Sequence, residues 1–247
     1  MALRNIRLVV AYDGTRYHGW QQQKNGLTVQ EVIEKSLQVM TELPVKLLAS
    51  GRTDAGVHAL NQVCNFETRS QIPVDALQRG LNALLPADIL IKDAAAVSLT
   101  FHSRYRAKSK TYEFRILNRQ HPDIFRRSVL WHIRFPLDVE KMSECLSLLK
   151  GTHDFSAFKS SGSANTDPVR TILTAGIEKD EDGVLRVVLE GNGFLRHMVR
   201  NIVGTLVDVG RGRMDIKYFG EVLESGDRRL AGMKAPPQGL FLMAVKY

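Results

Sequence analysis

The chain has 247 residues, of which 44% are hydrophobic and 24% are charged, a composition typical of globular proteins. No apolar run approaches the length of a membrane span, and the N-terminal run 8–12 is too short for a secretory signal. Two isolated cysteines exclude a disulfide framework, and the seven histidines show no metal-ligand spacing. We therefore expect a cytoplasmic protein with no metal site and no membrane partner.

The net charge is +8, which favours a polyanionic partner, with nucleic acid as the first candidate. Residues 1–108 carry 13 Lys and Arg against 9 Asp and Glu, and residues 109–247 carry 21 against 17, so each half has a charge of +4. Neither half is a basic tail. A polyanion could therefore contact both halves.

The first half alternates strand and helix patterns. A run rich in Val, Leu and Ile at 4–12 indicates a strand that ends at an Asp-Gly turn. Thr28 and Glu31 have capping-box spacing and predict the start of a helix. The further expected elements are short strands at 45–49 and 57–66, a helix at 74–85 and a strand at 89–97. This β-α-β-β-α-β order is that of ferredoxin-like domains.

The second half repeats the order of patterns, although not the residues. We expect a strand at 110–117, a helix with Asp138 as its N-cap, a hairpin of strands 171–178 and 184–190, helices at 194–209 and 216–223, and a closing strand at 240–247. The prediction is an α+β fold with two ferredoxin-like halves, 1–108 and 109–247. Their antiparallel sheets would join edge to edge, with helices on one face and a basic cleft between the halves.

The sequence motif GRTDAGVHA at 51–59 is the candidate catalytic site. It places one carboxylate, Asp54, two residues from Arg52 and between Gly51 and Gly56, where the backbone can turn sharply and another molecule can come close. A neighbouring positive charge favours the ionised carboxylate, which can act as a nucleophile. The alternative is an Asp that stabilises a turn, with Thr53 capping nearby. The local residues alone favour this alternative.

Two further segments have the composition of RNA contacts. The run 104–115 interleaves basic residues, which contact phosphates, with aromatic residues, which stack on unpaired bases. If the run is extended, one face carries Arg104, Arg106, Lys108, Lys110 and Tyr112, although a bend would break that alignment. A solvated edge strand is the alternative, and the aromatic residues favour RNA contact. The loop 17–23 reads equally well as a packed connection or as an RNA-facing loop.

The expected helix 194–209 carries Arg196 and Arg200 at i, i+4, on one face of a mostly apolar helix. A buried Arg needs a partner. Arg200 could point into the cleft and pair with Asp54, or either side chain could snorkel to the surface, and the sequence does not rank these. Residues 118–134 suggest a basic loop and residues 159–168 a mobile surface loop.

Six words spread over the whole chain resemble those of the tRNA pseudouridine synthase A (TruA) family. They are YDGTRYHGWQQQKNGLTVQ (12–30), SGRTDAGVHA (50–59), FHSRYRAKSKTYEFRIL (101–117), GTHDFSAF (151–158), GNGFLRHMVRNIVGTLVDVGRG (191–212) and APPQGLFLMAVKY (235–247). The family's fold, two ferredoxin-like halves with a basic cleft, agrees with the element order described above.

The resemblance implies an isomerase that converts uridine to pseudouridine in the tRNA anticodon stem-loop, at positions 38–40, as a homodimer without cofactor or metal. It places the catalytic Asp at Asp54, the substrate-contacting Tyr at Tyr112 and the active-site Arg residues at Arg52 and Arg200. Arg196 is a further candidate RNA contact. Glu113 and Arg106 depart from the commonest family pattern, which puts local RNA contacts in doubt but not the reaction.

In the expected mechanism Arg52 holds the everted nucleotide, Tyr112 packs on the uracil, and Arg200 keeps Asp54 ionised. Asp54 attacks either the sugar C1′ or the base, and Tyr112 or a water molecule removes the last proton. A glycoside or nucleoside hydrolase would usually need paired carboxylates, and the catalytic word has one. The other alternative is a non-catalytic RNA-binding protein with tandem ferredoxin-like sheets, in which an acid beside phosphate contacts would repel the RNA.

Overall fold

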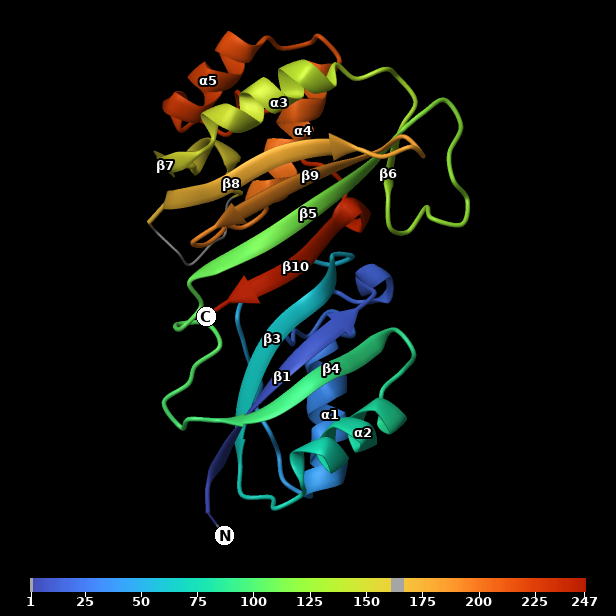
Figure 1. Ribbon diagram of the computed structural model, residues 1–247, viewed down its shortest axis with the longest axis vertical. Coiled ribbons are helices and arrows are strands. Elements are labelled where there is room, and N and C mark those ends of the chain that lie inside the picture. The colour runs from blue at the N-terminus through green and yellow to red at the C-terminus, as the bar shows by residue number, and fades with distance from the viewer. Residues whose placement is uncertain (1, 161–166) are drawn as a thin grey trace. The chain divides into compact units, whose positions relative to one another are not determined.

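The computed structural model describes residues 2–160 and 167–247 (Figure 1). The chain forms two compact units: one runs up to Lys108 and includes Phe241–Tyr247, and the other is Ser109–Leu240. The C-terminal strand thus lies in the first unit, whereas the sequence places residues 241–247 in the second half. Most of the loop expected at 159–168 lies outside the described residues. No helix in the described ranges is long and apolar enough to cross a bilayer.

The sheet of the first unit has the strand order of a ferredoxin-like domain. Its elements are β1 (Arg4–Tyr12), α1 (Val29–Thr41), β2 (Leu48–Ala49), β3 (His58–Thr68), α2 (Val74–Leu84), β4 (Ile89–Val97) and β10 (Leu240–Lys246). Strand β1 lies between β4 and β3 and pairs antiparallel with both. Strand β2 pairs antiparallel with β3, and β10 pairs parallel with it, with Phe241 opposite His58.

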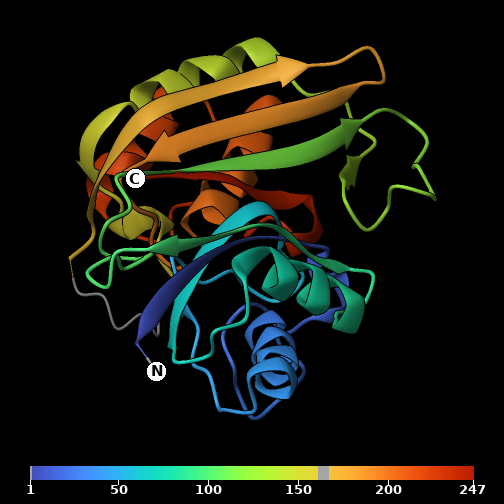
Figure 2. The same ribbon diagram turned by 60° about the horizontal axis from the view of Figure 1, so that its bottom comes forward.

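Local chemistry explains the first helix and its placement. The Oγ1 of Thr28 accepts a hydrogen bond of 3.3 Å from the N–H of Glu31, so the predicted N-cap is confirmed. The helix ends at Glu42, whose φ of 56° is left-handed. Ile33 and Leu37, one turn apart, are fully buried. Both α1 and α2 lie on one face of the sheet of their unit (Figure 2).

The second unit is also α+β. Its elements are β5 (Ser109–Asn118), β6 (Trp131–Ile133), α3 (Val139–Leu148), β7 (Gly151–Asp154), β8 (Val169–Lys179), β9 (Val184–Gly191), α4 (Met198–Gly210) and α5 (Ile216–Ser225). Strand β9 lies between β5 and β8 and is antiparallel to both, and β7 pairs with β8. The N-cap of α3 is Asp138, as predicted, because its Oδ1 accepts from the N–H of Lys141.

Two expectations for the second half are wrong. Helix α4 begins at Met198 and not at 194, because His197 has a left-handed φ of 62° that a right-handed helix cannot include. Arg196 therefore precedes the helix and does not share a helical face with Arg200. The region expected as a basic loop is without helix or strand over 119–130, and it leads into the short strand β6, which is parallel to β5. The four-residue strand β7 had no clear sequence pattern.

The basic and aromatic run is not one extended strand. The N–H of Arg106 donates to the carbonyl of His102 at 3.0 Å, which closes a turn, and β5 begins only at Ser109. The bend that the sequence left open is therefore present, and it breaks the common face that a fully extended run would give the five residues. Within β5, Lys110 and Tyr112 are two residues apart and do share a face.

Candidate functional site

Asp54 lies in a tight turn that delivers the chain to β3. The N–H of Val57 donates to the carbonyl of Asp54 at 3.1 Å, and Gly56 has a φ of 76°. A glycine with positive φ at the third position is what a type II β-turn requires. The turn expected from the flanking glycines is therefore present, and a buried strand follows it at once.

The residues before the turn differ in exposure. Arg52 is exposed, Thr53 is 7% exposed and Asp54 is half-buried. The exposed Arg52 and the half-buried Asp54 both keep part of their surface accessible, whereas Thr53 between them is buried.

The segment 12–20 backs this turn through main-chain hydrogen bonds. The N–H of Trp20 donates to the carbonyl of Thr53 at 3.1 Å, and the N–H of Gly56 donates to the carbonyl of Tyr17 at 3.2 Å. The Tyr12 hydroxyl lies 2.8 Å from Oγ1 of Thr53. This supporting role was not predicted, although the word YDGTRYHGW, read together with GRTDAG, could have indicated it.

The nearby carboxylate Asp13 has a structural role. Its Oδ1 accepts from the N–H of Thr15 at 2.9 Å and lies 3.1 Å from Nδ1 of His58. Burial acts to raise the pKa of Asp13, but the hydrogen bonds from the Thr15 hydroxyl and N–H outweigh it and hold that pKa below its ordinary value. Asp13 is thus suited to remain ionised, whereas an acid catalyst needs a raised pKa.

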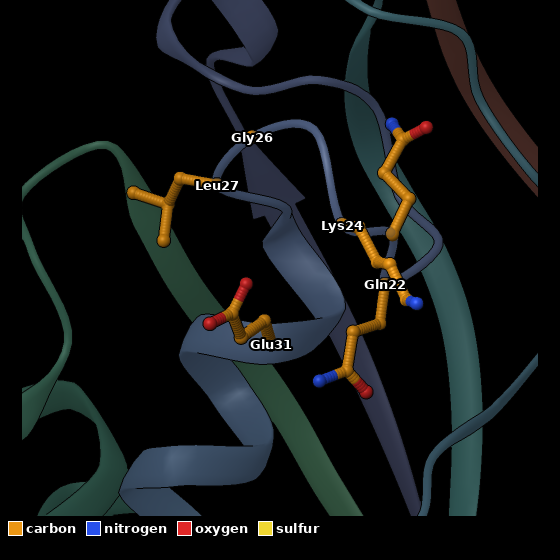
Figure 3. Close-up of a pocket in the computed structure, with 6 residues that line it drawn as sticks. Gln22, Lys24, Gly26, Leu27 and Glu31 are labelled. Carbon is orange, nitrogen blue, oxygen red and sulfur yellow. The ribbon is translucent and has the colours of Figure 1, made fainter.

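One part of the loop 17–23 is a packed connection, and the other part is exposed. Tyr17 and Trp20 are 3% and 2% exposed and pack inside the unit, and the Tyr17 hydroxyl donates to Asp88 at 2.7 Å. The residues that follow are exposed and border an open pocket of about 600 Å³ (Figure 3). The pocket is lined by Gln22, Gln23, Lys24, Gly26, Leu27 and Glu31. The aromatic residues are therefore core, and the polar ones are available to a ligand.

Tyr112 and Arg200 are both buried within the second unit. Tyr112 is 8% exposed on β5, and its ring meets the Phe194 ring edge-on at 5.0 Å. Arg200 is 7% exposed on α4, and its Nε donates to the carbonyl of Ala235 at 2.8 Å. Arg200 therefore does not snorkel to the surface, and its Nε has a backbone acceptor.

The remaining predicted contact residues differ in setting. Arg104, Arg106, Lys108 and Arg196 are exposed, and Lys110 is half-buried. Tyr105 is 77% exposed. Glu113, the departure from the family pattern, is buried and pairs with Nε of Arg115 at 2.6 Å. In the described ranges no three His, Cys, Asp or Glu residues are grouped as metal ligands.

A buried amide pair anchors the start of the basic run. The Nδ2 of Asn5 donates to the carbonyl of Phe101 at 2.9 Å, and Nδ2 of Asn65 donates to Oδ1 of Asn5 at 3.0 Å. Oδ1 of Asn65 accepts from the N–H of Ser103 at 2.9 Å, and the Tyr247 hydroxyl donates to the Ser103 carbonyl at 2.8 Å. These contacts join residues far apart in sequence, so no local pattern indicated them.

Comparison of the sequence with known proteins identifies the family of this chain. The family described as tRNA pseudouridine synthase matches residues 8–106 and 146–247. The chain is 49% identical to tRNA pseudouridine synthase A of Thermoanaerobacter sp. (strain X514) and 46% identical to that of Acetivibrio thermocellus. Each match extends over 99% of this chain and 100% of the relative. The chain therefore belongs to the tRNA pseudouridine synthase family, whose members are isomerases.

Proposed function

We propose that this protein converts uridine to pseudouridine in the anticodon stem-loop of tRNA, at positions 38–40, with Asp54 as the nucleophile. The observation that carries the proposal is the half-buried Asp54 on a turn braced by buried backbone contacts. Such bracing suits a nucleophile, because a catalytic group must be held in one geometry. The family membership supports the reaction class, and the finer site of action follows from the resemblance of the six sequence words.

The reaction breaks the N1–C1′ glycosidic bond and forms a C5–C1′ bond. A uridine in a stem must first leave the stack, which costs a few kcal/mol. We assign Arg52, exposed two residues from Asp54, to the everted nucleotide. Asp54 attacks C1′ or the base, the N1–C1′ bond breaks, and the uracil turns. C5 then bonds to C1′, the bond to Asp54 breaks so that its carboxylate is restored, the proton of C5 leaves, and N1 ends protonated. Arg200 and Tyr112 complete the proposed catalytic set.

Within this proposal Arg200 keeps Asp54 ionised and Tyr112 packs on the uracil, and Tyr112 or a water molecule takes the proton from C5. The exposed residues Arg104, Arg106, Lys108 and Arg196, with the half-buried Lys110, are assigned to RNA phosphates. The protein would act as a cytoplasmic homodimer without a cofactor.

The test is tritium release from unmodified tRNA transcripts labelled at uracil C5, without added metal. Wild-type protein should release tritium, and Asp54→Asn should not, since an amide is a poor nucleophile. Asp75→Asn is the matched control, because Asp75 is an exposed carboxylate of the first turn of α2 that pairs with Arg79. Full activity of Asp54→Asn would remove the nucleophile assignment, and mapping the modified uridines tests positions 38–40.

The competing function is RNA binding without catalysis. Both functions predict that the protein retains tRNA in a binding assay. Retention of tRNA by wild-type protein with no tritium release would support the binding module and contradict the synthase.

A further inference from the structure

We propose that Gly19 and the hydroxyl pair of Tyr12 and Thr53 are positioning residues that hold Asp54 in its reactive place. The inference rests on the proposed role of Asp54 as nucleophile. None of the three residues needs to touch the substrate, because the hydroxyl pair anchors Thr53, which precedes Asp54, and Gly19 packs on the backbone of the turn.

The hydroxyl pair fixes the residue next to Asp54. Tyr12 is 4% exposed and Thr53 is 7% exposed, and their oxygens lie 2.8 Å apart. Tyr12 is the last residue of β1, which pairs with strands on both sides. A hydrogen bond from this sheet therefore sets the direction of the Thr53 side chain. Since Asp54 is the next residue, this anchor also restrains the backbone from which the Asp54 side chain projects.

Gly19 brings a second segment against the same turn. It has a φ of +87°, and a Cβ there would lie 2.5 Å from the carbonyl oxygen of Thr53 and 3.0 Å from the carbonyl carbon of Asp54. Glycine is the residue that permits both the left-handed backbone and this close approach. The main chain of 19–20 thus packs directly on that of 53–54, and the 3.1 Å bond from Trp20 to Thr53 closes the contact.

Helix α1 holds this second segment in turn. The N–H groups of Val29 and Gln30 donate to the carbonyls of Gly19 and Trp20 at 3.2 and 3.0 Å. These N–H groups belong to the first helical turn and have no acceptor within the helix. The Asp54 turn is therefore clamped between the end of β1 and the start of α1. A 1 Å misplacement of a catalytic group can cost about 100-fold in rate. We therefore infer that these contacts serve the reaction by keeping Asp54 in position.

The test measures single-turnover tritium release at saturating tRNA, together with tRNA affinity, for Thr53→Val, Thr53→Ser, Tyr12→Phe and Gly19→Ala. Loss of one hydrogen bond should slow tritium release by Thr53→Val and by Tyr12→Phe about 5- to 10-fold. Thr53→Ser keeps the hydroxyl and should restore most of the rate. Gly19→Ala should slow release about 100-fold. The affinity for tRNA should change less than about twofold in all four, since no phosphate contact is removed.

Trp20 supplies a readout that general destabilisation of the folded protein would not move. The chain has two Trp residues, so a Trp131→Phe background leaves Trp20 as the single reporter. Its fluorescence maximum and acrylamide quenching should change in Gly19→Ala below the unfolding temperature. Gly183→Ala is the control, because Gly183 has a φ of +79° in the β8–β9 turn and a Cβ would meet only ordinary contacts, the nearest at 3.4 Å.

The outcomes separate the inference from the proposed function. An active wild type whose Thr53→Val and Gly19→Ala variants fold and react at the wild-type rate would overturn the inference alone. An equal loss in Gly183→Ala would overturn it as well. If the wild type releases no tritium, the proposed function fails and the inference with it. If Gly19→Ala does not fold, the rates of Thr53→Val and Thr53→Ser test the inference. Equal rates for these two variants would overturn it.

Discussion

Arg200 and Ala235 hold each other by two hydrogen bonds. Nε of Arg200 donates to the carbonyl of Ala235 at 2.8 Å, and the N–H of Ala235 donates to the carbonyl of Arg200 at 3.0 Å. The pair ties α4 to the segment that precedes η3 (Pro237–Gly239), and Arg200 remains a planar charged fork with further N–H donors. In the proposed mechanism Arg200 keeps Asp54 ionised, and the bond to Ala235 fixes the orientation of its guanidinium for that role.

Arg200→Lys should therefore lower the reaction rate although it keeps the charge. A lysine has no Nε donor to replace the bond to Ala235, and loss of a charged hydrogen bond costs about 1.5–3 kcal/mol. If the whole cost appears in the transition state, single-turnover tritium release falls about 10- to 150-fold. If Arg200→Lys reacts at the wild-type rate, the reaction does not depend on the planar guanidinium of Arg200.

Gly204→Ala should destabilise the second unit. A Cβ at Gly204 would lie 1.6 Å from the carbonyl oxygen of Met233 and 3.2 Å from the N atom of Ala235, so the segment that holds Arg200 must shift. Overpacking of this kind costs about 1–3 kcal/mol, which urea unfolding monitored by circular dichroism would measure.

The matched control for Gly204→Ala is Gly220→Ala in α5. Both glycines are helical, but at Gly220 a Cβ would meet one side-chain atom of Leu148 at 3.9 Å. Because Ala is the better helix former, Gly220→Ala should be neutral or stabilising by up to about 1 kcal/mol. Equal destabilisation by the two substitutions would contradict a packing role for Gly204.

Asp13 should contribute stability that is lost in acid. Its folded pKa lies below the ordinary value of 3.8, because hydrogen bonds from Thr15 outweigh the effect of burial. A depressed folded pKa stabilises the folded state above the unfolded pKa, and this contribution disappears as the pH falls through the folded pKa. Urea unfolding should show wild type more stable than Asp13→Asn at pH 7, with the difference shrinking below about pH 4. A difference that does not depend on pH would exclude this charge effect.

The exposed cations of the basic run should govern the salt dependence of tRNA binding. Replacing Arg104, Arg106 and Lys108 with Gln should lower the affinity and reduce the slope of log K against log salt by about 0.7–0.9 for each phosphate that is no longer neutralised. Tyr105→Ala should lower the affinity without changing the slope, because stacking releases no counterions. Lys217→Gln, in an exposed i, i+4 pair with Glu221 on α5, is the control and should change neither quantity.

Features determined by neighbours along the chain were predicted from the sequence. The N-caps Thr28 and Asp138 form as expected, because each side chain accepts from an N–H three residues later. The turn at Asp54 forms because Gly56 can take a positive φ. The order of the other strands and helices also followed from local periodicity, whereas the short strands β6 and β7 were not predicted.

Tertiary structure decided the features that depend on distant residues. The basic run bends just after a segment, 101–103, that is bonded to Asn5, Asn65 and Tyr247. The C-terminal strand joins the first unit through pairing of Phe241 with His58. The left-handed backbone of His197 shortens α4, and the sequence indicates it only weakly, because His is enriched in this conformation but the conformation is uncommon for any residue with a Cβ. The sequence by itself determined Asp54 and its turn. Which residues brace that turn was decided only when folding brought Tyr12 and Gly19 against Thr53.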